Sequence, residues 1–246
     1  MPRYRLRIEY DGSPFRGWQR QANAPSVQQA VEEAVKAFVG EPVRLRCAGR
    51  TDTGVHALGQ VAHVDIAREL RPDKFRDAAN AHLKPLPVTV LEAELAPETF
   101  DARVSAIRRH YLYRILDRRA PPALDRGRVW HVPYALDMAA MAEAGQAYLG
   151  RHDYTTFRAA ECQANSPLRT IEAFSVMRAG PEIEIRVAAR SFLHHQVRGM
   201  VGALLPVGRG AWGRDDIARI LAVCDRALCP GLAPPHGLYL AQVDYE

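Results

Sequence analysis

Two hydrophobic periodicities follow each other in a definite order along the first part of the chain, and this order limits the folds that the chain can adopt. Apolar side chains alternate with charged ones from Tyr4 to Tyr10, which is typical of a half-buried strand. A helical apolar stripe begins after the capping-box pair Ser26 and Gln29 and ends before Gly40. Together the patterns predict strands over 4–10, 43–47, 60–66 and 88–95 and helices over 26–38 and 72–82. This β-α-β-β-α-β order predicts a ferredoxin-like, split-βαβ lobe with helices on one face of an antiparallel sheet.

The rest of the chain carries a looser version of the same order. The turn Ala179-Gly180-Pro181 separates two alternating segments and predicts a hairpin. The expected strands cover 111–115, 170–178, 182–189 and 239–243, and the expected helices cover 137–149, 195–207 and 215–224. We therefore predict an α+β protein of two ferredoxin-like lobes with mainly antiparallel sheets, one lobe over residues 1–100 and the other over residues 101–246.

The composition is that of a folded protein. Hydrophobic residues make up 48% and charged residues 25% of the 246 residues, enough apolar side chain for a substantial core and too little charge for wholesale disorder. No apolar run is as long as a transmembrane helix, and the N-terminus lacks the apolar segment of a signal peptide, so we expect a cytoplasmic protein with no membrane partner. The four cysteines lack the paired spacing of a zinc site, so we expect no metal.

Positive charge is concentrated in one segment. The net charge of the chain is +5, and residues 103–128 contain eight arginines and two acids, so this segment carries +6 and the remainder −1. Such a segment is typical of a phosphate-binding surface, because the guanidinium fork suits phosphate oxygens. A solvated surface that binds nothing is the alternative. The candidate RNA contacts are Arg108, Arg109, Arg118 and Arg119.

The strongest chemical motif is the loop Gly49-Arg50-Thr51-Asp52-Thr53-Gly54, which lies between two predicted strands. Its two glycines permit unusual backbone angles, and the strand ends hold it in place. Arg50, two residues from Asp52, favours the ionised carboxylate. The pattern indicates a charged aspartate that is available as nucleophile or base. An Asx-turn, in which the side chain only bonds the local backbone, is the alternative.

Asp-Thr-Gly is also the motif of dimeric aspartic proteases, in which two aspartates share one proton. This chain has a single Asp-Thr-Gly sequence, at residues 52–54. Its helix-rich pattern also differs from the all-β pattern that such a protease requires. The sequence therefore argues against a protease.

The wider sequence resembles the tRNA pseudouridine synthase A family over nearly the whole chain. The stretch CAGRTDTGVHALGQVAHVD at residues 47–65 is similar to the family signature, and several other segments match it in the same order. These are Tyr10-Asp11-Gly12, Phe15-Arg16-Gly17-Trp18-Gln19, Arg109-His110-Tyr111-Leu112-Tyr113, Phe157-Arg158, Phe192-Leu193-His194-His195-Gln196-Val197-Arg198 and Gly237-Leu238-Tyr239-Leu240.

The resemblance implies a role for each matching site residue. Asp52 would be the catalytic nucleophile, and Arg50 would hold the target nucleotide out of its stack. Tyr111 would pack on the target base, and Arg198 would pair with the Asp52 carboxylate, closing a catalytic cleft between the lobes. His110 departs from the family pattern, where Arg or Lys is more usual, which puts a local phosphate contact in doubt.

The reaction implied is the isomerisation of uridine to pseudouridine in the anticodon stem-loop of tRNA, at nucleotides 38 to 40 by tRNA convention. The resemblance implies a homodimer that binds tRNA, and the chemistry requires no cofactor. The sequence leaves open whether Asp52 attacks C6, attacks C1′ or removes a ribose proton. It also leaves open whether His194 and His195 contact RNA. The alternative function is a non-catalytic RNA-binding protein of ferredoxin-like fold, although the aromatic signature of such modules is absent.

Overall fold

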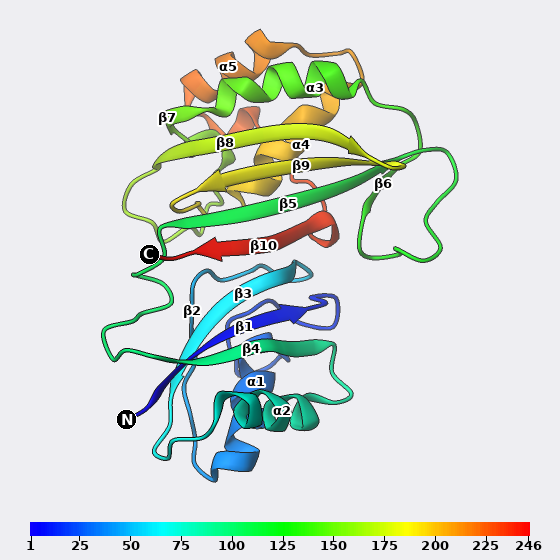
Figure 1. Cartoon of the computed structure of the whole chain (residues 1–246). Helices are drawn as coiled ribbons and strands as arrows, with labels where there is room; N and C mark the ends of the chain where they lie inside the picture. The colour runs from blue at the N-terminus through cyan, green and yellow to red at the C-terminus, as the bar shows by residue number, and fades with distance from the viewer. The chain divides into compact units, whose positions relative to one another are not determined.

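The computed structural model describes residues 1–246, as two compact units (Figure 1). Unit 1 comprises Met1–Arg109 and Tyr239–Glu246, and unit 2 comprises His110–Leu238. The fold is mixed α+β with mainly antiparallel strand pairing, which confirms the predicted class. The expected lobes met near residue 100, whereas the units divide after Arg109, and the last strand returns to unit 1. No helix is long and apolar enough to cross a membrane.

The sheet of unit 1 has the strand order β4-β1-β3-β10. Strand β1 pairs antiparallel with β3 on one side and with β4 on the other, and β10 runs parallel to β3. A short β2 also pairs with β3, antiparallel. The bounds are Arg3–Tyr10 for β1, Arg46–Cys47 for β2, His56–Asp65 for β3, Val88–Ala96 for β4 and Leu238–Asp244 for β10. All four predicted strands and both predicted helices of this unit are present, although β2 is shorter than expected.

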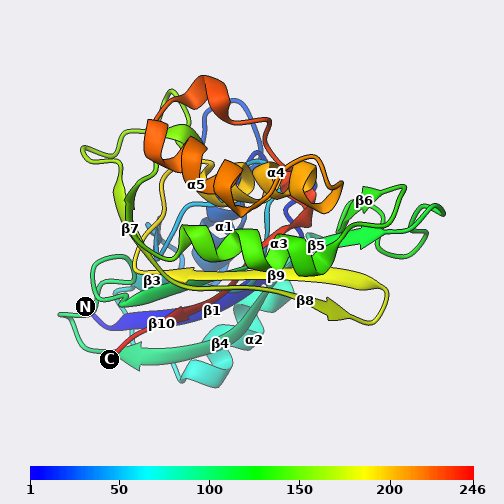
Figure 2. The ribbon, with the colours of Figure 1, turned by 90° about the horizontal axis from the view of Figure 1, so that it is seen from above.

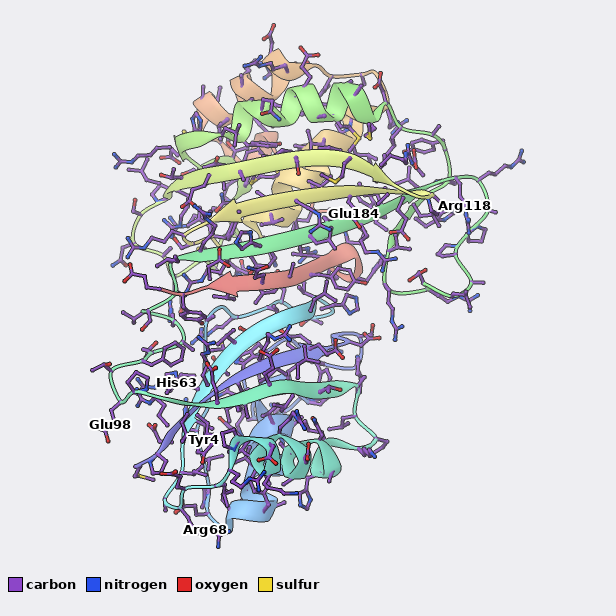
Figure 3. All side chains as sticks on the ribbon, in the orientation of Figure 1. Tyr4, His63, Arg68, Glu98, Arg118 and Glu184 are labelled. Atoms are coloured by element: carbon purple, nitrogen blue, oxygen red, sulfur yellow. The ribbon has the colours of Figure 1, made fainter.

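Two helices cover one face of this sheet, α1 over Val27–Val39 and α2 over Pro72–Leu83. The alternation along β1 turns Tyr4 toward α2, where its ring stacks on Phe75 with centroids 4.7 Å apart (Figure 3). Phe38 of α1 meets the same Phe75 ring edge-on at 5.2 Å. These aromatic contacts place both helices on the apolar side of the sheet.

The sheet of unit 2 has the order β5-β9-β8-β7, with β6 parallel to β5. Strands β8 and β9 form the predicted hairpin around Gly180. The bounds are Arg108–Asp117 for β5, Trp130–Val132 for β6, Gly150–Asp153 for β7, Leu168–Ala179 for β8 and Glu182–Ala189 for β9. Strands β6 and β7 were not expected, because three or four residues are too few to show a period.

Three helices pack on one side of the unit 2 strands, as Figure 2 shows. They are α3 over Met138–Gly145, α4 over Gln196–Gly208 and α5 over Arg214–Val223. The contact of α3 with β8 is close, because a Cβ atom on Gly145 would lie 2.2 Å from the Phe174 ring. A long connection over residues 118–129 joins β5 to β6 and begins at Arg118 (Figures 1 and 3).

Candidate active site

The Asp52 loop lies in unit 1, between β2 and β3. Asp52 is half-buried, Arg50 is exposed, and Thr51 between them is buried. The carbonyl of Asp52 accepts a hydrogen bond from the N–H of Val55 at 3.1 Å, which closes a turn. The turn presents the aspartate side chain on a short, constrained piece of backbone.

Residues that precede α1 in the sequence hold this loop in place through contacts with Thr51. The Tyr10 hydroxyl lies 2.7 Å from the Thr51 hydroxyl, and both side chains are buried. The N–H of Trp18 donates to the carbonyl of Thr51 at 3.0 Å. Both the side chain and the backbone of the residue before Asp52 are therefore fixed. This role of Tyr10 and Thr51 was not predicted from the sequence, although both residues lie within the matched motifs.

Two glycines let the same segment approach the loop closely. A Cβ atom on Gly17 would lie 2.6 Å from the Thr51 carbonyl oxygen, and Gly17 has a φ of +86°. A Cβ atom on Gly12 would lie 2.0 Å from the Val55 carbonyl oxygen. Real side chains do not make such contacts, so glycine is required at both positions. Both glycines lie within the segments that match the family, which was the available sequence signal for their importance.

His56 joins the end of the loop to the same segment. Its Nδ1 atom accepts a hydrogen bond from the N–H of Gly12 at 3.0 Å and lies 3.2 Å from Oδ1 of Asp11. The imidazole ring is buried and stacks on Tyr239, with centroids 4.7 Å apart. His56 therefore fixes the point at which β3 begins, directly after the Asp52 turn.

Tyr111 and Arg198 lie in unit 2. Tyr111 is on β5, half-buried, and its ring meets Phe192 edge-on with centroids 5.1 Å apart. Arg198 is the third residue of α4, and its Nε donates to the carbonyl of Ala233 at 2.8 Å. The N–H of Ala233 donates in return to the Arg198 carbonyl at 3.0 Å. The arginine is thus held by one neighbouring segment through both its backbone and its side chain.

Tyr113 supports that neighbouring segment. It is fully buried, and its hydroxyl donates to the carbonyl of Pro234 at 2.7 Å. A Cβ atom on Gly237 would lie 2.7 Å from the Tyr113 ring, so this contact also requires glycine. Burial raises the pKa of Tyr113 well above its usual value, and the phenol therefore remains a hydrogen-bond donor. Burial, helped by the charge of Arg198, lowers the pKa of His236.

The arginine-rich segment divides into two groups. Arg108, Arg118 and Arg119 are exposed. Arg109 is buried, and its guanidinium donates to backbone carbonyls. Arg114 also serves the fold, because its Nε donates to Glu182 at 2.8 Å. The expected phosphate-binding surface therefore contains arginines in two different environments.

The remaining candidates are two adjacent histidines at the start of α4 and one cysteine near the Asp52 loop. His194 and His195 have ring centroids 4.0 Å apart, and His195 is the N-cap of α4 with a φ of +67°. Burial raises the pKa of the Cys47 thiol to about 12, so this cysteine near the loop stays protonated and is a poor nucleophile. Asp52 and Arg50 lie in one unit and Tyr111 and Arg198 in the other, and the pairing of Asp52 with Arg198 stays a prediction.

Comparison with known proteins identifies the class to which this fold and loop belong. The sequence matches the tRNA pseudouridine synthase family over residues 7–103 and 144–246, and the chain belongs to that family. It is similar to the tRNA pseudouridine synthase A of Methylocella silvestris, with 60% identity over 246 residues, covering 100% of this chain and 99% of that protein. Two proteins of the same name, from Nitrobacter winogradskyi and Parvibaculum lavamentivorans, are 59% and 58% identical over 246 residues. Both alignments cover 100% of this chain, with 96% and 100% of the relatives covered respectively.

Proposed function

We propose that this chain is an isomerase that converts uridine to pseudouridine in tRNA, with Asp52 as the catalytic nucleophile. The observation that carries the proposal is the Asp52 loop, a family motif held in one conformation by buried contacts. Tyr10 and Trp18 bind Thr51, and Gly17 passes too close to the loop for any other residue. A carboxylate carried on backbone that is fixed in this way can act on a reactive atom with little reorganisation of the loop.

The chemistry explains which groups the enzyme needs. The bond from uracil N1 to ribose C1′ breaks, the base turns, and C5 bonds to C1′. The C5 proton leaves and N1 gains a proton, so substrate and product have the same composition. No redox change or phosphoryl transfer occurs, and we propose that the reaction uses no cofactor. Asp52 acts at C6, at C1′ or on a ribose proton.

The target uridine must leave its stack before Asp52 can reach it, which costs a few kcal/mol. We propose that Tyr111 recovers part of this cost by packing on the base, and that Arg50 holds the displaced nucleotide. Arg50 is exposed two residues from Asp52, where a cation can meet a phosphate and also favour the ionised carboxylate. Arg198 pairs with Asp52 in this proposal.

The substrate is proposed in finer detail from the family resemblance. The targets are uridines in the anticodon stem-loop, at nucleotides 38 to 40 by tRNA convention. Exposed Arg108, Arg118 and Arg119 contact phosphates in this proposal, so the affinity for tRNA should fall steeply as the salt concentration rises. We further propose that the enzyme is cytoplasmic and works as a homodimer with tRNA lying across both subunits.

The test is to map pseudouridine in unmodified tRNA after incubation with the purified protein and no added cofactor. Pseudouridine at nucleotides 38 to 40, absent with Asp52→Asn, would support the proposal. Binding of tRNA without any pseudouridine would favour the alternative, a non-catalytic RNA-binding protein of ferredoxin-like fold. Pseudouridine at other nucleotides only would keep the activity and overturn the assigned target.

A further inference from the structure

Arg109 differs from the arginine beside it. Arg108 and Arg109 are adjacent on β5, where successive side chains point to opposite faces. Arg108 is exposed, whereas Arg109 is only 8% exposed. A phosphate contact suits the first environment, because a backbone phosphate must reach the guanidinium from solvent. The buried position of Arg109 suggests a different role.

The Arg109 guanidinium binds backbone carbonyls. Its Nη2 donates to the carbonyl of Ala48 at 2.8 Å and to that of Arg103 at 2.7 Å, and its Nη1 donates to the carbonyl of Ala106 at 3.0 Å. Arginine suits this task because its planar fork carries five N–H donors in fixed directions. Both N–H groups of Nη2 are used, and they link two segments that are far apart in the sequence.

Ala48 is the residue that immediately precedes the Asp52 loop. It is buried, and its N–H donates to the carbonyl of Val61 on β3 at 2.8 Å. The next carbonyl, that of Gly49, accepts from Nε2 of Gln60 at 2.7 Å. The start of the loop is thus held by β3 on one side and by Arg109 on the other.

The other carbonyls bound by Arg109 belong to a turn that is itself anchored. The N–H of Ala102 donates to Nδ1 of His63 at 3.0 Å, and His63 is a buried residue of β3 (Figure 3). The hydroxyl of Tyr245 donates to the Ala102 carbonyl at 2.7 Å. Arg109 therefore ties the start of the Asp52 loop to a part of unit 1 that has little freedom to move.

We infer that Arg109 is a positioning residue, which fixes the start of the Asp52 loop through the Ala48 carbonyl and does not contact tRNA. The inference rests on the proposed function for its effect on catalysis. Loss of the guanidinium leaves buried carbonyls without donors, so the loop will sample other conformations and Asp52 will spend less time in its working position.

The experiment compares Arg109→Met with two single-arginine controls. In Arg109→Met we expect the single-turnover rate at saturating enzyme to fall about tenfold to a hundredfold, with tRNA affinity and its salt dependence unchanged. Arg108→Met should instead weaken binding and reduce the salt slope by about one. Arg7→Met removes an exposed arginine of the same unit, one paired with Glu92, and should leave the rate unchanged.

Amide hydrogen exchange over residues 48–54 provides a readout that is independent of activity. Exchange should be faster in Arg109→Met and unchanged in Arg7→Met. If the wild type makes no pseudouridine, the proposed function fails. Hydrogen exchange then still tests whether Arg109 fixes the start of the Asp52 loop. Arg109→Lys keeps the charge but loses the fork, and it replaces Arg109→Met if the latter does not fold. Wild-type rate and exchange in a folded Arg109 variant, or a reduced salt slope, would overturn the inference.

Discussion

The Asp52 loop and the Arg198 helix hold their functional residues in different ways. Asp52 lies on irregular backbone, and its neighbour Thr51 is fixed by partners that are 33 or more residues away in the sequence, Tyr10 and Trp18. Arg198 lies in the first turn of α4, where the helix itself sets the direction of the side chain. One segment, through Ala233, then fixes its guanidinium.

This difference indicates how each region should respond to change. Irregular backbone has no repeating hydrogen bonds, so each tertiary contact to the Asp52 loop helps to determine where the loop lies. A helix keeps its direction when one contact is lost, because neighbouring turns and the packed apolar face remain. We therefore expect substitutions of the residues that support Asp52 to alter the reaction rate, and substitutions of the residues that support Arg198 to act mainly on local stability.

The largest effect should come from Asp52→Asn, which removes the functional group and leaves its support intact. Asparagine can keep the same turn, so the fold and tRNA binding should stay close to those of the wild type. Without the carboxylate the nucleophile is absent, and multiple-turnover activity should be lost. The activity would be measured by the release of tritium from tRNA whose uridines carry tritium at C5. Activity above background in a preparation free of wild-type enzyme would contradict the role of Asp52.

The next largest effect should come from Arg198→Met. If Arg198 pairs with Asp52, its loss leaves a charge without its partner, at a cost of about 3 kcal/mol, which corresponds to roughly a hundredfold in rate. Arg198→Lys should recover little, since a single ammonium cannot both bind Ala233 and present a fork. Single-turnover rates at saturating enzyme separate this effect from weaker binding. A wild-type rate for Arg198→Met would exclude the pairing.

The same contrast explains what the sequence could predict. Helix α1 follows from its apolar stripe and from the Ser26 and Gly40 caps, both of which the structure contains. The existence of strand β1, and the hairpin of β8 and β9, likewise follow from alternation. Local patterns specify such elements because the interactions that form them are close in sequence. The return of β10 to unit 1 joins residues that are far apart in sequence, and no local pattern reports it.

The same limit applies to the site residues, because contacts between residues that are distant in the sequence are not predicted by local patterns. The glycines and arginine around Asp52 make it a candidate, but the wider family resemblance decides for it over an Asx-turn, and Arg198 was found only through that resemblance. The roles of Tyr10 and Thr51 could not be read from the sequence, because their contact joins residues that are 41 apart. Arg109 was assigned to the phosphate-binding surface on charge alone. Its burial depends on which face of β5 meets the turn at Arg103 and Ala106, and composition carries no such information.

A glycine pair tests whether close packing on the loop controls the rate. Gly17 and Gly40 have nearly the same φ, +86° and +85°, but only Gly17 has the loop within reach of a Cβ atom. Alanine costs about 1–2 kcal/mol at either position through backbone strain. Gly17→Ala should also displace Thr51 and slow the reaction about tenfold, whereas Gly40→Ala should lower only the melting temperature. Equal rates in the two variants would show that the contact at Thr51 does not control Asp52.

The smallest effects, and the sharpest comparison, come from two buried tyrosine hydroxyls. Tyr10 binds the Thr51 hydroxyl and Tyr113 binds the Pro234 carbonyl, each at 2.7 Å. Replacement by phenylalanine removes one hydrogen bond in each case, worth about 1 kcal/mol. In Tyr10→Phe that loss falls on irregular backbone beside Asp52, and the single-turnover rate should fall roughly fivefold.

In Tyr113→Phe the loss falls on the segment that supports Arg198, while α4 keeps its own hydrogen bonds. The free energy of unfolding should therefore fall by about 1 kcal/mol, with a smaller change in rate than in Tyr10→Phe. Denaturant unfolding and single-turnover kinetics on both variants make the comparison. If Tyr113→Phe slows the reaction more than Tyr10→Phe at a similar loss of stability, the direction of Arg198 depends on its neighbouring segment and not on the helix. The proposed difference between the Asp52 loop and helix α4 would then be wrong, because Asp52 and Arg198 would depend on tertiary contacts to the same degree.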